Sequence, residues 1–223
     1  MIITIDGPAG SGKSTVSQLL AKRLQYQYLD TGAMYRAVAL QIKRKEIPLG
    51  STEKLRELCR DLVIRFETKG DERRVFIGSE DVSSAIRTPE LDLLSSKISA
   101  IREVREAMST LQRRIAGTEN LVAEGRDMGT VVFPDAPFKF FITAGSDVRA
   151  ERRYRERINR GETVLRRQVK SDLEKRDEQD RTRSLAPSIP AKDAFMIDTS
   201  SITAEQVVGI ILDKIQDRGG IGS

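Results

Sequence analysis

The chain has no histidine and no tryptophan, and it has only one cysteine among its 223 residues. The absence of histidine excludes a Ser-His-Asp triad, a histidine general acid and a metal site built on imidazole. The single cysteine, Cys59, excludes a disulfide within the chain and fits a reducing compartment. We expect Cys59 to be a small buried residue on a helix, because no histidine is present to activate it as a nucleophile.

Aromatic residues and long apolar runs are also scarce. No apolar run approaches the ~20 residues that a membrane-spanning helix needs. The first apolar segment begins at Met1 without a basic leader, so we expect a cytoplasmic protein with no signal peptide. Aromatic side chains, at 5% of the chain, are too few for a base-stacking surface. The length suits one α/β domain with insertions.

The net charge of +5 is concentrated in one segment. Residues 149–183 contain 13 basic and 8 acidic side chains, whereas the remaining 25 basic and 25 acidic side chains cancel. An arginine-rich surface suits small polyphosphates as well as nucleic acid. Because the excess is local and aromatic residues are few, we expect small-molecule phosphate ligands and no nucleic-acid partner.

Short apolar runs alternate with segments of helical periodicity, a pattern typical of parallel βαβ units. We therefore expect an α/β fold with a parallel sheet flanked by helices. The predicted strands are Ile2 to Asp6, Gln27 to Leu29, Leu121 to Glu124, Phe138 to Thr143 and Phe195 to Asp198, and the predicted helices include residues 15–24, 104–115 and 204–215. Residues 149–183 predict two helices joined by a mobile turn at Gly161, and the tail 218–223 is predicted to fray.

One region departs from this alternation. The apolar runs Val63 to Phe66 and Arg74 to Ile77 flank Lys69-Gly70-Asp71, which predicts a β-hairpin with a turn at the glycine. We expect this hairpin, at about residues 62–78, to be an insertion outside the parallel sheet.

A phosphate-binding pattern, G-x-x-x-x-G-K-[ST], follows the first predicted strand and leads into a predicted helix. It consists of Gly7, Pro8, Ala9, Gly10, Ser11, Gly12, Lys13, Ser14 and Thr15. Such a loop curls its backbone N–H groups around phosphate oxygens, with Lys13 at the β- and γ-phosphates and the Ser14 hydroxyl on Mg²⁺. A plain glycine-rich turn is the alternative, but the joint agreement of glycine spacing, lysine, hydroxyl and flanking elements argues against it.

Two further predicted strands end in charged residues. Asp30 and Arg36 follow the second strand. Glu124 ends the third, and Arg126 and Asp127 follow it in a predicted glycine-rich turn at residues 125–130. Ligands of open α/β folds bind at the carboxyl ends of strands, and arginine grips phosphate through two parallel donors. We expect an anionic acceptor near these residues, with Glu124 orienting water bound to Mg²⁺. Asp30 also begins an Asp-Thr-Gly sequence, but an aspartic protease would need a paired carboxylate in an all-β chain.

Almost the whole chain resembles the bacterial-type cytidylate (CMP) kinases, within the nucleoside monophosphate kinases. The similarity lies in the segment Ile5 to Thr15, in Asp30-Thr31-Gly32-Ala33-Met34-Tyr35-Arg36, in Gly125 to Ala136, in Arg176 to Arg183 and in Ala186 to Ala194. It implies a single P-loop kinase domain over residues 1–223, a monophosphate-binding insertion at about 31–115 and a helical lid at about 149–167. It also implies transfer of the γ-phosphoryl group of ATP, with Mg²⁺, to CMP or dCMP in pyrimidine nucleotide metabolism, by a monomer.

The resemblance also assigns residues to roles. It implies that Arg36, Arg126 and Arg183 hold the acceptor phosphate, that Asp180 and Arg176 meet the sugar hydroxyls, and that Ser96, Arg105 and Asp127 read cytosine. Asp30 and Thr31 belong to the implied acceptor site, and Arg152 and Arg153 of the lid are expected to reach the transferring phosphate. A surface of salt bridges with Glu151 and Glu156 is the alternative for these arginines and is retained for Arg155 and Arg157.

Other functions remain open at this point. A kinase for a different small acceptor fits the same phosphate loop. A nucleotide-driven switch is disfavoured because no Asn-Lys-x-Asp motif is present. A nucleic-acid motor is disfavoured because the phosphate loop lies at the extreme N-terminus and the basic excess is confined to residues 149–183.

Overall fold

A five-stranded sheet carries the phosphate-binding pattern in the computed structural model, which describes residues 1–69 and 72–219. The strand order is β2-β6-β1-β7-β8. The bounds are β1 Ile2–Asp6, β2 Gln27–Asp30, β6 Leu121–Gly125, β7 Phe138–Thr143 and β8 Phe195–Asp198. Strand β1 pairs in parallel with β6 and β7, and β7 pairs in parallel with β8. The predicted α/β fold with a parallel sheet is confirmed.

The chain divides into two compact units. Residues 1–29 and 116–223 form one, which we call the sheet unit, and residues 30–115 form the other, which we call the insertion unit.

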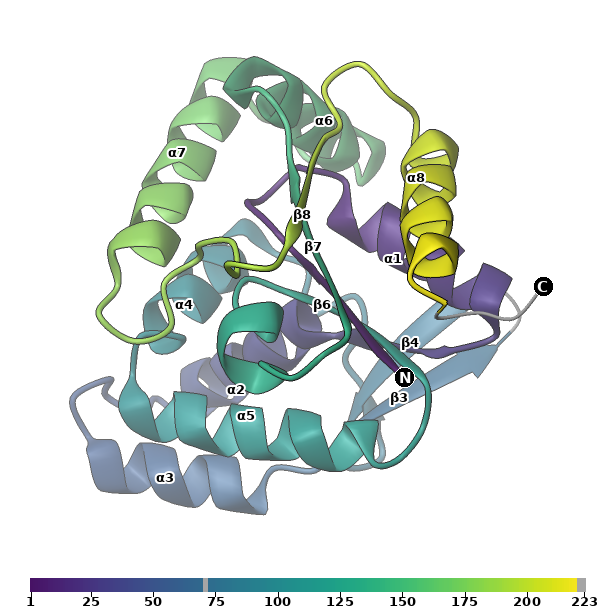
Figure 1. The fold of residues 1–223 in the computed structure, drawn as a ribbon. Coiled ribbons are helices and arrows are strands. Elements are labelled where there is room, and N and C mark those ends of the chain that lie inside the picture. Colours follow the sequence, from purple (N-terminus) through teal and green to yellow (C-terminus); the bar gives the residue numbers. More distant parts are fainter. Residues whose placement is uncertain (70–71, 220–223) are drawn as a thin grey trace. The chain divides into compact units, whose positions relative to one another are not determined.

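Apolar side chains on both faces of the strands form the core of the sheet unit. Ile3 and Ile5 on one face of β1 and Thr4 on the other are completely buried, as expected of a strand covered on both faces. Helices α1 (Lys13–Leu24) and α8 (Ala204–Asp217) lie side by side and bury Leu20 and Ile211 in the same cluster (Figure 1). Both helices begin within two residues of their predicted starts.

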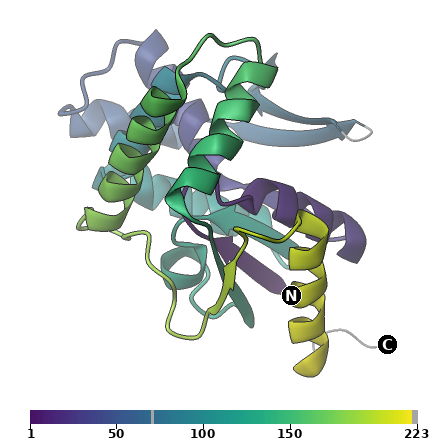
Figure 2. The same cartoon turned by 90° about the horizontal axis from the view of Figure 1, so that it is seen from above.

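The sheet unit contains two charged helices, α6 (Ser146–Asn159) and α7 (Arg166–Thr182), which confirms the two helices predicted for residues 149–183. They lie side by side in Figure 1 and Figure 2. Their small apolar contact contains Ala150, Val169 and Leu173, and a surface ion pair joins Asp147 to Lys170. The segment between them includes Gly161 at φ +79°, a left-handed conformation that glycine adopts without a Cβ clash.

The insertion unit combines helices with the predicted hairpin. Its helices are α2 (Thr31–Arg44), α3 (Thr52–Asp61), α4 (Pro89–Ile98) and α5 (Arg102–Ala116). Strands β3 (Ile64–Lys69) and β4 (Glu72–Ile77) pair antiparallel, as predicted, and a short strand, β5 (Glu80–Asp81), extends them (Figure 2). Residues Gly70 and Asp71 of the predicted turn lie outside the described residues.

Cys59 lies buried on α3, as the sequence predicts. Burial raises the pKa of its thiol from 9.0 to about 11. A thiol held protonated in this way is a poor nucleophile at neutral pH.

The backbone after β6 differs from the prediction. A glycine-rich turn was expected at residues 125–130, but Met128–Val132 form one turn of π-helix, η1. Within the described residues, no helix is both long enough and apolar enough to cross a membrane. Of the tail predicted to fray, residues 220–223 lie outside the described part.

Candidate active site

The phosphate loop and two other loops start at one edge of the sheet. Because β1, β6, β7 and β8 are parallel, residues following their last positions meet at the same carboxyl edge. The phosphate loop follows β1, Arg126 and Asp127 follow β6, and Thr199 follows β8. This edge is where an open α/β sheet binds its ligands.

Three glycines give the phosphate loop its path. Gly7, Gly10 and Gly12 have φ values of +146°, +74° and +91°, which L-residues rarely adopt. A Cβ at Gly7 would lie 2.0 Å from the carbonyl oxygen of Ile142 on β7. Gly7 is therefore required by close approach to the neighbouring strand as well as by its backbone conformation.

Lys13 begins α1 and is 6% exposed. Its Nζ donates to the carbonyl oxygen of Pro8 at 2.7 Å, which folds the side chain back over the loop. Burial, and after it the charge of Arg126, lowers the pKa of Lys13 from 10.5 to about 7, although the charge of Glu124 opposes this shift. Phosphate oxygens at this position would favour the charged ammonium.

Ser14 and Glu124 lie together, as the magnesium prediction requires. The Ser14 hydroxyl donates to Glu124 Oε1 at 2.9 Å, although the two residues are 110 positions apart. One hydroxyl and one carboxylate are a donor set that suits Mg²⁺, which is usually held by one or two protein groups together with substrate phosphates and water. The residues present therefore fit the ion.

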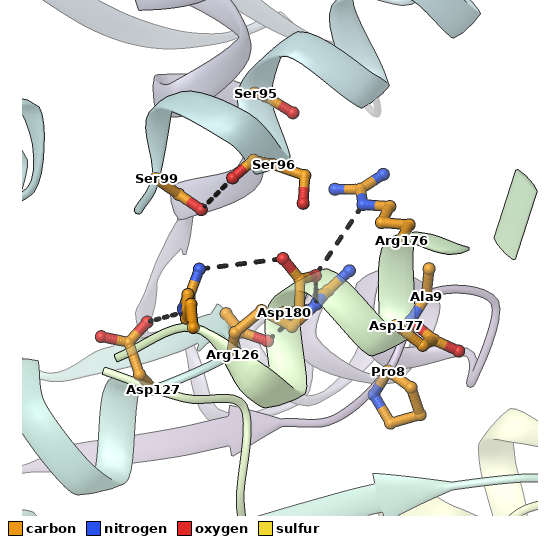
Figure 3. A network of polar contacts seen from close by, with 12 residues as sticks. Pro8, Ala9, Ser95, Ser96, Ser99, Arg126, Asp127, Arg176, Asp177 and Asp180 are labelled. Carbon is orange, nitrogen blue, oxygen red and sulfur yellow. Dashed lines mark hydrogen bonds and ion pairs between the residues drawn. The ribbon is translucent and has the colours of Figure 1, made fainter. Parts of the chain in front are cut away.

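Five charged side chains of the sheet unit form a network, which we call the arginine cluster: Arg126, Asp127, Arg176, Asp180 and Arg183. Figure 3 labels the first four of these residues. Asp180 lies at its centre. Its Oδ2 is 3.1 Å from Arg126 Nε and 3.9 Å from Arg176 Nε, and its Oδ1 is 3.7 Å from Arg183 Nη1.

The arginine cluster is buried and carries excess positive charge. Asp127 is 2% exposed and Asp180 is 3% exposed, and Asp127 Oδ1 lies 3.6 Å from Arg183 Nη2. Three guanidinium groups face two carboxylates, and Arg126 also lowers the pKa of Lys13. A buried excess of cations is costly unless an anion joins it, so this arrangement suits a phosphate group.

Helix geometry explains why α7 supplies most of the cluster. Arg176, Asp180 and Arg183 are spaced at i, i+4 and i+7, which places them on one face of the helix or at its C-terminal cap. Strand β6 delivers Arg126 and Asp127 directly after its last residue, Gly125.

Asp6, the last residue of β1, holds the backbone that directly follows Asp127 of the cluster. It is 5% exposed and its two carboxylate oxygens accept from the backbone N–H groups of Met128 at 2.9 Å and Gly129 at 2.8 Å. Burial raises the pKa of Asp6 from 3.8 to about 6, and the two backbone donors oppose this rise. The bonds begin η1 directly after Asp127, which explains the difference from the predicted turn.

The acceptor residues predicted in the insertion unit fall around α2 and α4. Asp30 caps α2, its Oδ1 accepting from Ala33 N at 2.8 Å, and Thr31 is buried at the first helical position. Arg36 Nη2 lies 3.6 Å from Asp30 Oδ2, and Arg36 Nη1 lies 3.7 Å from Asp92 Oδ1 on α4. The Arg36 Nε is buried without a hydrogen-bond partner.

Ser96 and Arg105, predicted to read the base, are brought together through Ser99. Arg105 Nη1 donates to the Ser99 carbonyl oxygen at 3.0 Å, and the Ser99 hydroxyl donates to the Ser96 carbonyl oxygen at 2.7 Å. Arg105 also lies 5.9 Å from the centre of the Tyr35 ring. Ser96 and Arg105 are 6% and 5% exposed, so neither is an ordinary surface residue.

The arginines of α6 have different surroundings. Arg152 donates to the hydroxyl of Thr199 at 2.9 Å and to its carbonyl oxygen at 2.6 Å, and its Nη1 also reaches the Ser11 carbonyl oxygen at 3.4 Å. Arg153 pairs with Glu156 at 2.7 Å. Arg152 thus lies at the phosphate loop.

The surface alternative is confirmed for Arg155, which is exposed and bonds Glu151 at 2.7 Å. For Arg157 the surface alternative is wrong: its side chain is only 12% exposed and pairs with Glu162 and Asp172 instead of Glu151 and Glu156.

Sequence reasoning missed four residues that contact the loop or position the cluster: Asp6, Arg149, Asp177 and Thr199. Asp6 is a charge that ends an apolar strand, a pattern that could have drawn attention to it. Asp177 lies within the segment Arg176 to Arg183, where only three other residues were assigned. Nothing in the local sequence distinguishes Arg149 or Thr199.

A phosphate loop and a buried arginine cluster at one edge of a parallel sheet define an α/β protein of the P-loop kinase class. The family model for cytidylate kinase matches residues 3–217. The chain is 46% identical over 218 residues to the cytidylate kinase of Citrifermentans bemidjiense, covering 98% of this chain and 94% of that one. It is 45% identical over 228 residues to the cytidylate kinase of Salinibacter ruber, covering 100% of both. The chain belongs to the cytidylate kinase family.

The fold is also similar to the crystal structure of an uncharacterized protein from Eubacterium ventriosum. The TM-score is 0.55 at 15% identity, covering 98% of this chain and 99% of that chain. This likeness concerns the fold alone.

Proposed function

We propose that this chain transfers the γ-phosphoryl group of ATP to CMP or dCMP, giving ADP and CDP or dCDP. The observation that carries the proposal is the buried arginine cluster at the sheet edge where the phosphate loop begins. The loop suits a triphosphate donor, and the excess positive charge of the cluster suits an anionic acceptor.

The donor is held by residues 7–15. Their backbone N–H groups and Lys13 bind its phosphates, and Ser14 with Glu124 would hold Mg²⁺ directly or through water. The ion supplies charge neutralisation on the β- and γ-phosphate oxygens when it is bound.

The acceptor is held by charged and polar side chains. Arg36, Arg126 and Arg183 bind its phosphate, and Asp180 with Arg176 meets the sugar. Asp30 and Thr31 complete this part of the site by fixing the start of α2, from which Arg36 extends. For the base, the N4 amino group of cytosine donates to Asp127, and Ser96 and Arg105 supply donors for N3 and O2. Uracil reverses the pattern at N3 and C4 and leaves buried groups unpaired.

Catalysis consists of positioning and charge stabilisation. The acceptor phosphate is already an anion, with a second pKa of about 6, so no side chain needs to remove a proton from it. Lys13, Arg126, Arg152, Arg153 and Arg183 stabilise the negative charge that develops on the transferring group. Residues 149–167 form the lid that excludes water. Because Arg152 already bonds the carbonyl oxygen of Ser11, we assign the moving part of the lid to residues after Arg152.

We also propose that the reaction belongs to pyrimidine nucleotide metabolism in the cytoplasm. The enzyme acts as a monomer without a nucleic-acid partner.

A coupled assay that follows ADP formation tests this function with CMP, dCMP, UMP, AMP and dTMP as parallel acceptors. We expect turnover with CMP and dCMP to exceed turnover with the other three by at least tenfold. Lys13→Ala should lower kcat by about 100-fold or more while the melting temperature stays near that of the wild type. Preference for another acceptor, or near-normal transfer by Lys13→Ala, would overturn the proposal.

A further inference from the structure

Ala9 of the phosphate loop is bound by α6 and α7 through each of its three parts. Its methyl group packs in the apolar cluster of Ala150, Val169 and Leu173. Its N–H donates to Asp177 Oδ1 at 3.2 Å, and its carbonyl oxygen accepts from Arg149 Nη1 at 3.0 Å. Figure 3 shows Asp177 beside Ala9.

Asp177 and Arg149 form a pair around this residue. Arg149 Nη1 also bonds Asp177 Oδ2, and Arg149 Nε donates to the carbonyl oxygen of Ala144, just after β7, at 3.0 Å. The side chains of Arg149 and Asp177 are 11% and 20% exposed. The pair therefore connects the loop to the end of β7 in a largely buried setting, where a charge-assisted bond is stronger than on the surface.

The next residue, Gly10, makes this contact relevant to the loop's shape. Its φ is +74°, and a Cβ there would lie 2.8 Å from the carbonyl oxygen of Arg149. The bend at Gly10 is therefore formed directly against α6. The direction of this bend decides where the following N–H groups point, and those groups bind the phosphates of the donor in our proposed function.

We propose that Asp177 is a positioning residue for the donor site: through the N–H of Ala9 and through Arg149 it holds the phosphate loop in the conformation that binds a nucleotide diphosphate moiety. This role rests on the proposed function, which identifies the ligand of the phosphate loop as the donor nucleotide. The two carboxylate oxygens of Asp177 accept from Ala9 and Arg149, so we assign Asp177 to the shape of the loop and not to contact with the ligand.

The chain offers a matched control on the same two helices. Asp147 of α6 pairs with Lys170 of α7 at 2.8 Å, and Asp147 is largely exposed. This pair joins α6 to α7 just as Arg149 and Asp177 do, but within the described part of the chain neither of its side chains bonds the phosphate loop. Asp147→Ala therefore removes a helix-to-helix ion pair and leaves Ala9 untouched.

The experiment measures ADP binding by isothermal titration calorimetry, without acceptor, together with the KM for ATP and for CMP. Asp177→Ala should weaken ADP binding and raise the KM for ATP by about tenfold to 100-fold, the loss expected for bonds to a charged group. The KM for CMP should change less than twofold. Asp147→Ala should leave all three values within twofold of the wild type.

Asp177→Asn separates the two contacts, since an amide oxygen still accepts from Ala9 while the charge that pairs with Arg149 is lost. We expect an ADP affinity between those of the wild type and Asp177→Ala. If Asp177→Ala does not fold, Asp177→Asn decides: a loss of at least threefold supports the role, and an unchanged affinity overturns it.

An equal rise of both KM values in Asp177→Ala, with a melting temperature well below that of Asp147→Ala, would also overturn it, because that result indicates general damage. A wild type that binds ADP but phosphorylates no cytidine nucleotide would refute only the proposed function, since ADP binding is measured without an acceptor.

Discussion

The carboxylate of Asp127 has two roles. It pairs with Arg183, and it is the proposed acceptor for the N4 amino group of cytosine. We predict that Asp127→Ala lowers the ratio of kcat/KM for CMP to that for UMP by about tenfold to 100-fold, the cost of a lost bond to a charged group. Steady-state kinetics with both acceptors measures this ratio. ADP affinity should stay within about twofold, since Asp127 is not assigned to the donor, and an unchanged ratio would refute its role in reading the base.

Asp6 predicts a pH dependence of stability. Its pKa, raised from 3.8 to about 6 mainly by burial, means that the folded state takes up a proton more readily than the unfolded state. The stability that this protonation contributes is present below pH 4 and is lost as the pH rises through about 6. The full difference corresponds to about 3 kcal/mol.

Asp6→Asn removes this titration. We therefore expect the free energy of unfolding of the wild type, relative to that of Asp6→Asn, to fall by about 3 kcal/mol between pH 4 and pH 7. Urea denaturation of both proteins across this range measures the difference, in which groups that titrate alike in both proteins cancel. A difference that stays constant with pH would contradict the prediction.

At the scale of elements, α7 serves two sites with adjacent residues. Arg176 and Asp180 face the arginine cluster. Asp177, the residue directly after Arg176, faces Ala9 and α6. A rotation of 100° per residue separates these directions on a helix. The two roles are thus separable by single substitutions within one turn.

Helix α8 begins with a complete capping box. The Thr203 hydroxyl accepts from Gln206 N at 3.3 Å, and Gln206 Oε1 accepts from Thr203 N at 2.8 Å. Thr203→Ala should lower the free energy of unfolding by about 1 kcal/mol. Ser51 is the matched control, because it occupies the N-cap of α3 without a side-chain cap bond, so Ser51→Ala should change it by less than about 0.5 kcal/mol. Chemical denaturation compares the two.

Elements with local signals could be predicted from the sequence. The apolar run of β1, the helical period of α8 and the Gly-Asp turn signal between β3 and β4 all reside within a few neighbouring residues. The π-helical turn η1 could not, because its start depends on Asp6, which is 122 positions from Met128. For the same reason Thr199, whose hydroxyl bonds the carbonyl oxygen of Ser11 from 188 positions away, gave no signal.

At the scale of the molecule, Arg36 belongs to the insertion unit, whereas the phosphate loop belongs to the sheet unit. Arg36→Ala, in the insertion unit, should raise the KM for CMP by about tenfold to 100-fold, because a charged partner of its phosphate is lost. ADP affinity measured by calorimetry should be unchanged. Arg44 of the same helix is the control, since it is half-exposed and pairs with Glu80, and Arg44→Ala should leave both values unaltered. Equal effects of the two substitutions would contradict the assignment.

The single buried thiol allows the rate of local opening to be measured. Cys59 lies in the insertion unit, and the sheet unit contains no other sulfhydryl group that could give a background signal. Since burial holds its pKa near 11, an alkylating reagent modifies the chain only when α3 opens and exposes the sulfur. The rate of mass increase during a pulse of reagent therefore times the opening of residues 30–115 in the unaltered enzyme, with or without its nucleotides.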